Sequence, residues 1–266
     1  MSRKDLKNKP LVEAILEIRW HLIQPIKVQG PAQMILPALD PHYRLLLGRL
    51  FDRFRDEYPF HEQLPTATLP DDMVGHVVQH RFRSAKDDWP LVQVGPGVFT
   101  VNDTHRYTWT DFQQRTKEAV VRLYDAHPSI AEFRIQSLVL RYIDAVEYNY
   151  QEENAFAFLN DKMKVGITLP DSLFHMTGVE SRPCSFSWQA TFQCSKPAGR
   201  VHVSFATGQK EEKPAILWET TVQSVGDDVP NMPDGFPDWI DAAHEITDDW
   251  FFKLIEGELK RRFQGE

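Results

Sequence analysis

Short segments in which apolar residues occupy every second position recur along most of this chain. The first, residues 10–22, reads PLVEAILEIRWHL and alternates apolar residues with Glu13, Glu17 and Arg19. Successive side chains of a strand point to opposite faces of a sheet, so this period predicts strands with one face in a core. Further segments of this kind lie at 75–84, 89–94, 98–102, 132–149, 184–194, 199–208 and 215–225. The pattern favours mainly antiparallel sheets.

Other segments between these strands show the period of an amphipathic helix. The expected helices span 40–59, 110–128, 155–163 and 236–263, the last as one long closing helix. Asp40 is the expected N-cap of the first helix. Thr110 and Gln113 have the spacing of a capping box at the start of the second.

The order of these expected elements repeats once along the chain. Residues 1–130 give strand, helix, strands and helix, and residues 131–266 give strand, short helix, strands and helix. No low-complexity linker separates the two parts, so the sequence predicts a single domain over 1–266 with two pseudo-equivalent halves. The expected fold class is α+β, with mainly antiparallel sheets packed against long amphipathic helices.

Charge and hydropathy restrict the partners of such a protein. The formal net charge is −8, which disfavours nucleic-acid binding by neutralisation of phosphates. No apolar run approaches the roughly 20 residues of a membrane-spanning helix. The amino terminus, MSRKDLKNKP, is not followed by the apolar stretch of a signal peptide. These features predict a cytoplasmic protein that does not enter a membrane.

The stretch QVGPGVFTVN, residues 93–102, is a candidate binding loop because it holds a Gly-Pro-Gly between apolar runs. A phosphate-binding loop usually leads into a helix, whose N-terminal amides face the anion, whereas a strand follows here. The preferred interpretation is a hairpin turn in which glycine supplies a positive φ and Pro96 stiffens the chain. A ligand-binding loop is the alternative.

The polar and aromatic residues that follow this strand are the candidate binding site. Asn102, His105, Arg106, Tyr107 and Trp109 lie between the end of a strand and the start of a helix. Side chains at such a junction can converge on a ligand or a partner. The alternative interpretation is that the tyrosine and the tryptophan cover the edge of the core.

No motif in the chain specifies a reaction or a metal. His76 and His80 are expected on one strand about 13 Å apart, too far to share a zinc ion. His244 and Asp248 are four residues apart on the closing helix, but the second histidine of an HExxH motif is missing. A solvated helix flank is therefore preferred for this pair over a ligand pair. We predict no catalytic residue, metal or cofactor.

Three stretches carry a resemblance to a known family: KPLVEAILEIRW, LVQVGPGVFTVN with YTWTDF, and AAHEITDDWFF. In these the chain resembles a sporadically distributed family of bacterial proteins of about this length with no assigned activity. Gln93 and Asn102 take the positions of that family's central strand motif, with a longer spacing between them. The resemblance implies an accessory role in toxin-antitoxin or antiphage defence loci.

These observations favour a non-catalytic binding or accessory protein that presents a groove or surface to a protein partner or a small ligand. Aromatic residues are frequent in interfaces, and several tryptophans are available as anchors. They are Trp188, Trp218, Trp239 and Trp250. The alternative is an enzyme of unusual type acting on a small or nucleotide-like substrate near the candidate site. Nucleic-acid binding through a local patch is a third, disfavoured hypothesis.

Overall fold

A computed structural model describes residues 3, 6–23, 39–70, 74–104 and 106–266. The strands are β1 (Leu11–Trp20), β2 (Phe60–Gln63), β3 (His80–Arg83), β4 (Leu91–Gly95), β5 (Val98–Asp103), β6 (Ile135–Glu147), β7 (Ser187–Ser195), β8 (Ala198–Lys210) and β9 (Lys213–Val225). The helices are α1 (Tyr43–Phe54), α2 (Trp109–Ala126), α3 (Ala155–Met163), α4 (Phe236–Leu254) and α5 (Glu258–Gln264). The mixture of helices with a large antiparallel sheet confirms the α+β class.

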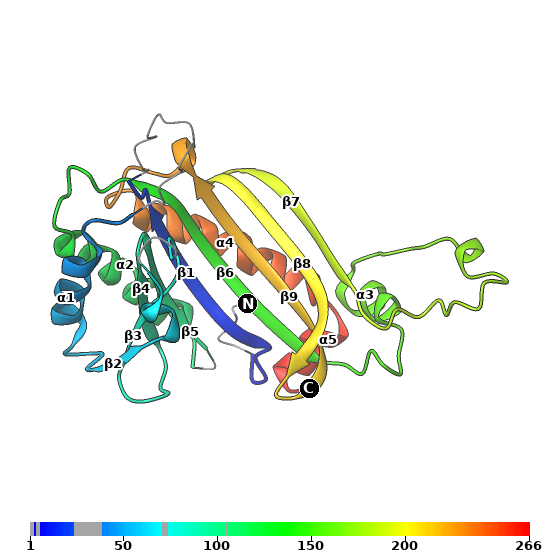
Figure 1. The fold of residues 1–266 in the computed structure, drawn as a ribbon. Coiled ribbons are helices and arrows are strands. Elements are labelled where there is room, and N and C mark those ends of the chain that lie inside the picture. The colour runs from blue at the N-terminus through cyan, green and yellow to red at the C-terminus, as the bar shows by residue number, and fades with distance from the viewer. Residues whose placement is uncertain (1–2, 4–5, 24–38, 71–73, 105) are drawn as a thin grey trace, which may run out of the picture.

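All nine strands form one sheet in the order β2-β3-β4-β5-β1-β6-β9-β8-β7 (Figure 1). β1 and β6 are central neighbours and pair antiparallel over most of their length. β5 flanks β1 on one side, and β9 flanks β6 on the other. From each central strand the chain crosses to an edge of the sheet and then returns inward through consecutive antiparallel strands, β2 to β5 beside β1 and β7 to β9 beside β6.

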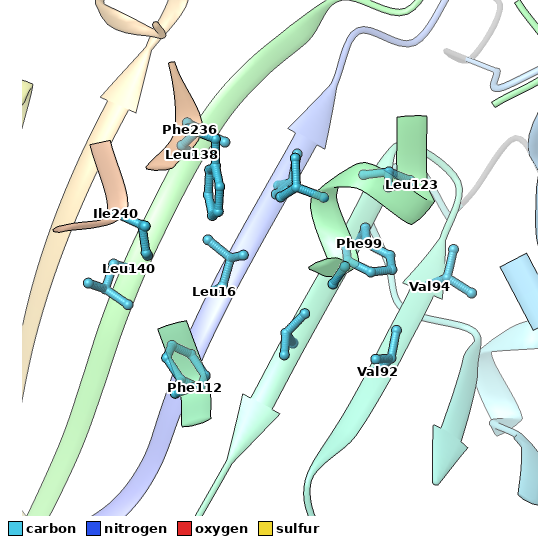
Figure 2. Close-up of a cluster of buried hydrophobic side chains, with 14 of the residues drawn as sticks. Leu16, Val92, Val94, Phe99, Phe112, Leu123, Leu138, Leu140, Phe236 and Ile240 are labelled. Carbon is cyan, nitrogen blue, oxygen red and sulfur yellow. The ribbon is translucent and has the colours of Figure 1, made fainter. Parts of the chain in front are cut away.

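One face of the sheet packs against helices and forms the main core. Leu16 of β1 and Leu140 of β6 lie directly opposite each other and are fully buried. Phe112 of α2 and Ile240 of α4 belong to the same cluster of buried side chains (Figure 2). The alternation in β1 explains this arrangement, because every second residue from Ala14 onward is apolar and points toward the helices.

The closing helix is not continuous, contrary to the prediction for 236–263. α4 ends at Leu254, and α5 starts at Glu258 after Gly257, which has a φ of 108°. L-residues rarely adopt this backbone conformation, so the glycine allows the break. No helix within the described residues is both long and apolar enough to cross a membrane.

The predicted N-caps also differ from those observed. Asp40 does not cap α1, whose N-cap is His42; its carboxylate accepts hydrogen bonds from the His42 amide and the Trp20 indole instead. Thr108 caps α2, and its hydroxyl oxygen accepts a hydrogen bond from the backbone amide of Asp111. The motif therefore begins two residues before the predicted pair of Thr110 and Gln113, because the helix starts earlier than its apolar period indicates.

The Gly-Pro-Gly stretch is a hairpin turn, as the preferred interpretation stated. Gly95 and Val98 pair across the β4–β5 hairpin, and Gly97 has a φ of 73°. The Gly97 amide donates to the Asp40 carboxylate, and the Pro96 carbonyl accepts the amide of His76. These backbone polar atoms, which a ligand-binding loop would offer to a ligand, are thus already hydrogen-bonded to other groups of the protein.

We expect Gly97→Ala to lower the free energy of unfolding. A Cβ there would lie 2.6 Å from a Leu22 methyl carbon, and positive φ costs an L-residue roughly 1–2 kcal/mol. Gly48→Ala, on helix α1 with open space around it, should instead stabilise the protein by about 0.5–1 kcal/mol. Urea unfolding of both variants measures the difference, and equal stabilities would contradict the observed turn.

Candidate functional site

The four described residues of the predicted site do not converge on one point. Asn102 is buried on the sheet face opposite to α2 and α4. Tyr107 and Trp109 lie on the helix side, where they contact α4 and β6. Arg106 is exposed on the loop between β5 and α2, and His105 lies outside the described residues. As a set of binding residues they remain a prediction, and each sheet face must be considered separately.

On the helix side, Tyr107 begins a chain of buried polar side chains. Its hydroxyl lies 2.7 Å from that of Tyr142 on β6, and the Tyr142 hydroxyl lies 3.1 Å from Nδ1 of His244 on α4. The His244 ring stacks on Trp109 with 3.6 Å between ring centroids. Burial raises the pKa of both tyrosines well above the ordinary value. All of these side chains are therefore neutral hydrogen-bonding groups at pH 7.

Arg3 and two carboxylates extend this buried network. One guanidinium nitrogen of Arg3 donates to both oxygens of Asp144, at 3.0 and 3.2 Å. Nε of Arg3 lies 3.5 Å from the carboxylate of Asp248 on α4. The guanidinium carbon is 3.7 Å from the centroid of the Phe251 ring and 4.6 Å from that of Tyr142. The charge is thus paired with acids and covered by aromatic rings.

This environment corrects the interpretation of His244 and Asp248 as a solvated helix flank. His244 is held between Trp109 and Tyr142, and burial and then the charge of Arg3 lower its pKa to about 3. Burial raises the pKa of the Asp248 carboxyl, against the opposing effect of Arg3. Both side chains are therefore half-buried where the sheet and α4 pack together.

The buried network supports packing more directly than it supports catalysis. The cavity beside Arg3, Lys9 and Tyr107 measures about 10 Å³, which is room for about one water molecule. Within the described part of the chain, no group of three or more His, Cys, Asp or Glu side chains has the arrangement of a metal site. The network can fix Arg3 and α4 against the sheet.

The opposite sheet face, which we call the open face, is polar. In Figure 1 α4 runs behind the central strands, and none of the described helices crosses the face toward the viewer. The strand registers align one residue from each of the nine strands across this face. This polar row is Glu62, Arg81, Gln93, Thr100, Glu17, Val139, Gln223, Arg200 and Gln193. Only Val139 in it is apolar.

Hydrogen bonds connect side chains of the row on β3, β4 and β5 with their neighbours on the same face. Asn102 accepts from the Gln93 amide at 3.2 Å and from the Thr100 hydroxyl at 2.5 Å, and it donates to Glu13 at 2.7 Å. Arg81 donates to the Gln93 side-chain oxygen at 2.7 Å. Thr100 and Asn102 are both buried on this face. The result is a fixed pattern of donors and acceptors.

Charges of both signs alternate on the open face. Arg19 lies 2.8 Å from the carboxylate of Glu17, and Arg141 lies 3.3 Å from that of Glu219. Burial raises the pKa of Glu13, while Asn102 and nearby arginines oppose this shift. Arginine and glutamate thus occur as neighbours among the described residues of this face, which disfavours the single-sign field that attracts nucleic acid.

Comparisons with known proteins do not assign this chain to a family. No protein-family model, curated protein or solved structure matches the chain. The resemblance seen in the sequence motifs therefore remains a prediction, as does the defence role that it implies.

The sequence did not point to Arg3, Asp144 and Asp248 as a unit. One signal for Asp144 was available, because it continues the inward-facing series of Leu138, Leu140 and Tyr142 along β6. A charged residue at an inward position requires a partner. The partner itself, Arg3, is 141 residues away in the chain and has no local pattern that marks it.

Replacement of Arg3 should destabilise the protein strongly. Arg3→Met leaves Asp144 buried without its cation, and loss of one partner of a buried pair typically costs about 3–5 kcal/mol. The double variant Arg3→Met/Asp144→Leu should recover most of this loss. Arg55→Met, at an exposed pair with Asp52, should cost less than about 1 kcal/mol. Urea unfolding curves compare the variants, and an equal cost for Arg3→Met and Arg55→Met would contradict the buried pair.

His244 should make the stability depend on pH below neutrality. Its pKa is about 3 in the folded chain against about 6.5 in an unfolded one, so between these values only the unfolded chain binds the proton. The free energy of unfolding should therefore fall as the pH drops below about 6.5, by at most about 1.4 kcal/mol per pH unit from this group.

Thermal unfolding between pH 7 and pH 4 measures this dependence, and His244→Gln should show a shallower slope than the parent protein. His175→Gln, at an exposed position, serves as the control and should keep the parent slope. Identical slopes in all three proteins would show that the His244 ring accepts protons equally well in the folded state.

Proposed function

We propose that this chain is a non-catalytic binding or accessory protein whose open face receives a protein partner. The observation that supports this proposal is the polar row, which crosses all nine strands on a face without a covering helix among the described residues. If this face only had to remain in contact with water, scattered lysines and glutamates without fixed partners would be sufficient. Side chains held in a hydrogen-bonded pattern instead offer a partner a pre-organised surface.

The balance of charges favours a protein over a nucleic acid as the partner. Each of Arg19, Arg81 and Arg141 has a carboxylate within 4 Å, so phosphates would meet acids as well as bases. A protein surface with its own mixed charges can complement such a pattern, which gives specificity and fixes the register of docking. The proposed interface therefore depends on the matching of alternate charges.

The open face also draws on both ends of the chain. Residues before 130 supply β1 to β5, and later residues supply β6 to β9. In this proposal the two parts are pseudo-equivalent halves that meet at the β1–β6 pair, and the partner spans that junction. We place the interaction in the cytoplasm, and we attribute a role in toxin-antitoxin or antiphage loci to the sequence resemblance alone.

The alternative of an enzyme of unusual type gains no support from the predicted site. Asn102 and Tyr107 lie on opposite faces of the sheet, so a substrate cannot contact both at one reacting centre. The protein-binding proposal has no such requirement.

Charge reversal on the open face tests the proposed interface. Arg141→Glu places an acid beside Glu219, so binding of a partner matched to the original charges should weaken at least about tenfold. Arg55→Glu makes the same charge change at the C-cap of helix α1, away from the open face, and should leave binding unchanged. The measurement is equimolar co-elution with the product of a neighbouring gene, followed by titration.

Retention of full affinity by the correctly folded Arg141→Glu variant would place the partner elsewhere. Measurable substrate turnover that is lost when Arg106 is replaced would favour the enzyme alternative instead.

A further inference from the structure

A cavity of about 850 Å³ lies at one end of the sheet. The chain segment that leads into β1 forms one side of it, and residues 209–211 of the β8–β9 hairpin form the other. Both segments lie at the same end of the sheet in Figure 1. Ligand pockets commonly measure about 300–1,000 Å³, so this cavity has the size that a nucleotide or a similar small molecule needs.

The cavity concentrates positive charge in an acidic protein. Lys7, Lys9 and Lys210 line it, and Glu211 is the only carboxylate among the described residues that do so. The chain as a whole has a formal charge of −8. This local excess of ammonium groups thus runs against the charge of the whole molecule.

Lysines elsewhere in the described structure are often neutralised. Those that form ion pairs with carboxylates are Lys117, Lys162, Lys213 and Lys253. Within the described chain, Lys7 and Lys210 lie within 4 Å of no carboxylate. An anion bound in the cavity would gain favourable electrostatic energy from each of these ammonium groups.

Lys9 is held in position for such an anion. Its ammonium nitrogen donates to the Tyr107 carbonyl oxygen at 2.8 Å. An ammonium group has three donors, so this contact orients Lys9 and leaves others for a ligand. The neighbouring Asn8 is also fixed, since its backbone amide and its side chain donate to the carbonyls of Phe263 and Arg262. The segment with the lysines is therefore attached to the body of the protein at several points.

Apolar side chains complete the lining. Leu11 and Val12 of β1 and Leu217 of β9 border the same cavity as the lysines. A small inorganic anion would use only the cationic part of such a site. A molecule with a phosphate group and a less polar remainder would contact both parts.

We propose that this cavity binds a phosphate-bearing small molecule of nucleotide size. Lys7, Lys9 and Lys210 contact its phosphate groups, and Val12 and Leu217 contact the remainder. This site is separate from the polar row, so it does not depend on the partner proposed for the open face. Because the ligand joins residues 7–9 to the β8–β9 hairpin, its binding also stabilises the folded chain.

Calorimetric titration with ATP and with tripolyphosphate tests the proposal on the full chain at low ionic strength. We expect saturable binding of both, with ATP tighter because its nucleoside contacts the apolar lining. Lys210→Glu should weaken each by at least about tenfold, and binding should fall as salt increases. Lys253→Glu makes the same charge change at an exposed position of helix α4 and should keep the parent affinity within about twofold.

Absence of saturable binding to the parent protein, or equal losses in Lys210→Glu and Lys253→Glu, would overturn the proposal. Equal or tighter binding of citrate, a carboxylate polyanion, would overturn its preference for phosphate. Arg141→Glu separates the two proposals, because it should abolish partner binding while ATP affinity remains unchanged. Thermal unfolding of Lys210→Glu checks that a loss of affinity is not a loss of folding.

Discussion

The antiparallel pairing of β1 with β6 is the constraint on which the rest of the structure depends. These strands bring together parts of the chain that are more than 100 residues apart, and the remaining strands continue the sheet on both sides of this pair. Their alternation also decides the character of both faces. Leu16 and Leu140 point to the helices, whereas Glu17 and Arg141 point away, so a shift of one residue in register would exchange core and surface.

The two faces divide the polar residues into groups with different physical roles. On the helix side, Arg3, Asp144 and the tyrosine pair are enclosed, and their hydrogen bonds fix one packing arrangement of Arg3 and α4 against the sheet. On the open face, Asn102 and Glu13 have neighbours of the same kind, but no described helix covers them. Similar hydrogen-bonding side chains therefore support the interior on the helix side and form a fixed pattern on the open face.

Alternation made much of the fold predictable from sequence. The first strand was expected at 10–22 and spans Leu11–Trp20, and the short helix at 155–163 has the predicted bounds. Features decided by single residues were less predictable: Gly257 divides the closing helix, and Thr108 takes the cap expected two residues later. A glycine in a helical pattern allows either a continuous or a broken helix. Two hydroxyl residues in one turn allow either of them to be the N-cap. In both cases tertiary packing selects the observed structure.

The candidate site was predictable only in part, for a similar reason. Asn102 and Tyr107 were expected to act together because they are close in sequence, but the end of β5 separates them onto two faces. Prediction of the polar row requires the registers of all eight strand pairings, and the alternation within a single strand does not contain this information. The cavity likewise joins the start of the chain to a hairpin some 200 residues later, so its lysines had no recognisable spacing.

Carboxyl footprinting of the free chain and of its complex tests the central claim most directly. Carbodiimide-driven labelling of Glu17, Glu62 and Glu219 reports on the open face, while Asp52 on helix α1 reports on the opposite side. If the open face receives the partner, the three glutamates are labelled in the free protein and protected in the complex, and labelling of Asp52 does not change. Equal labelling of the three glutamates in both states would contradict the account.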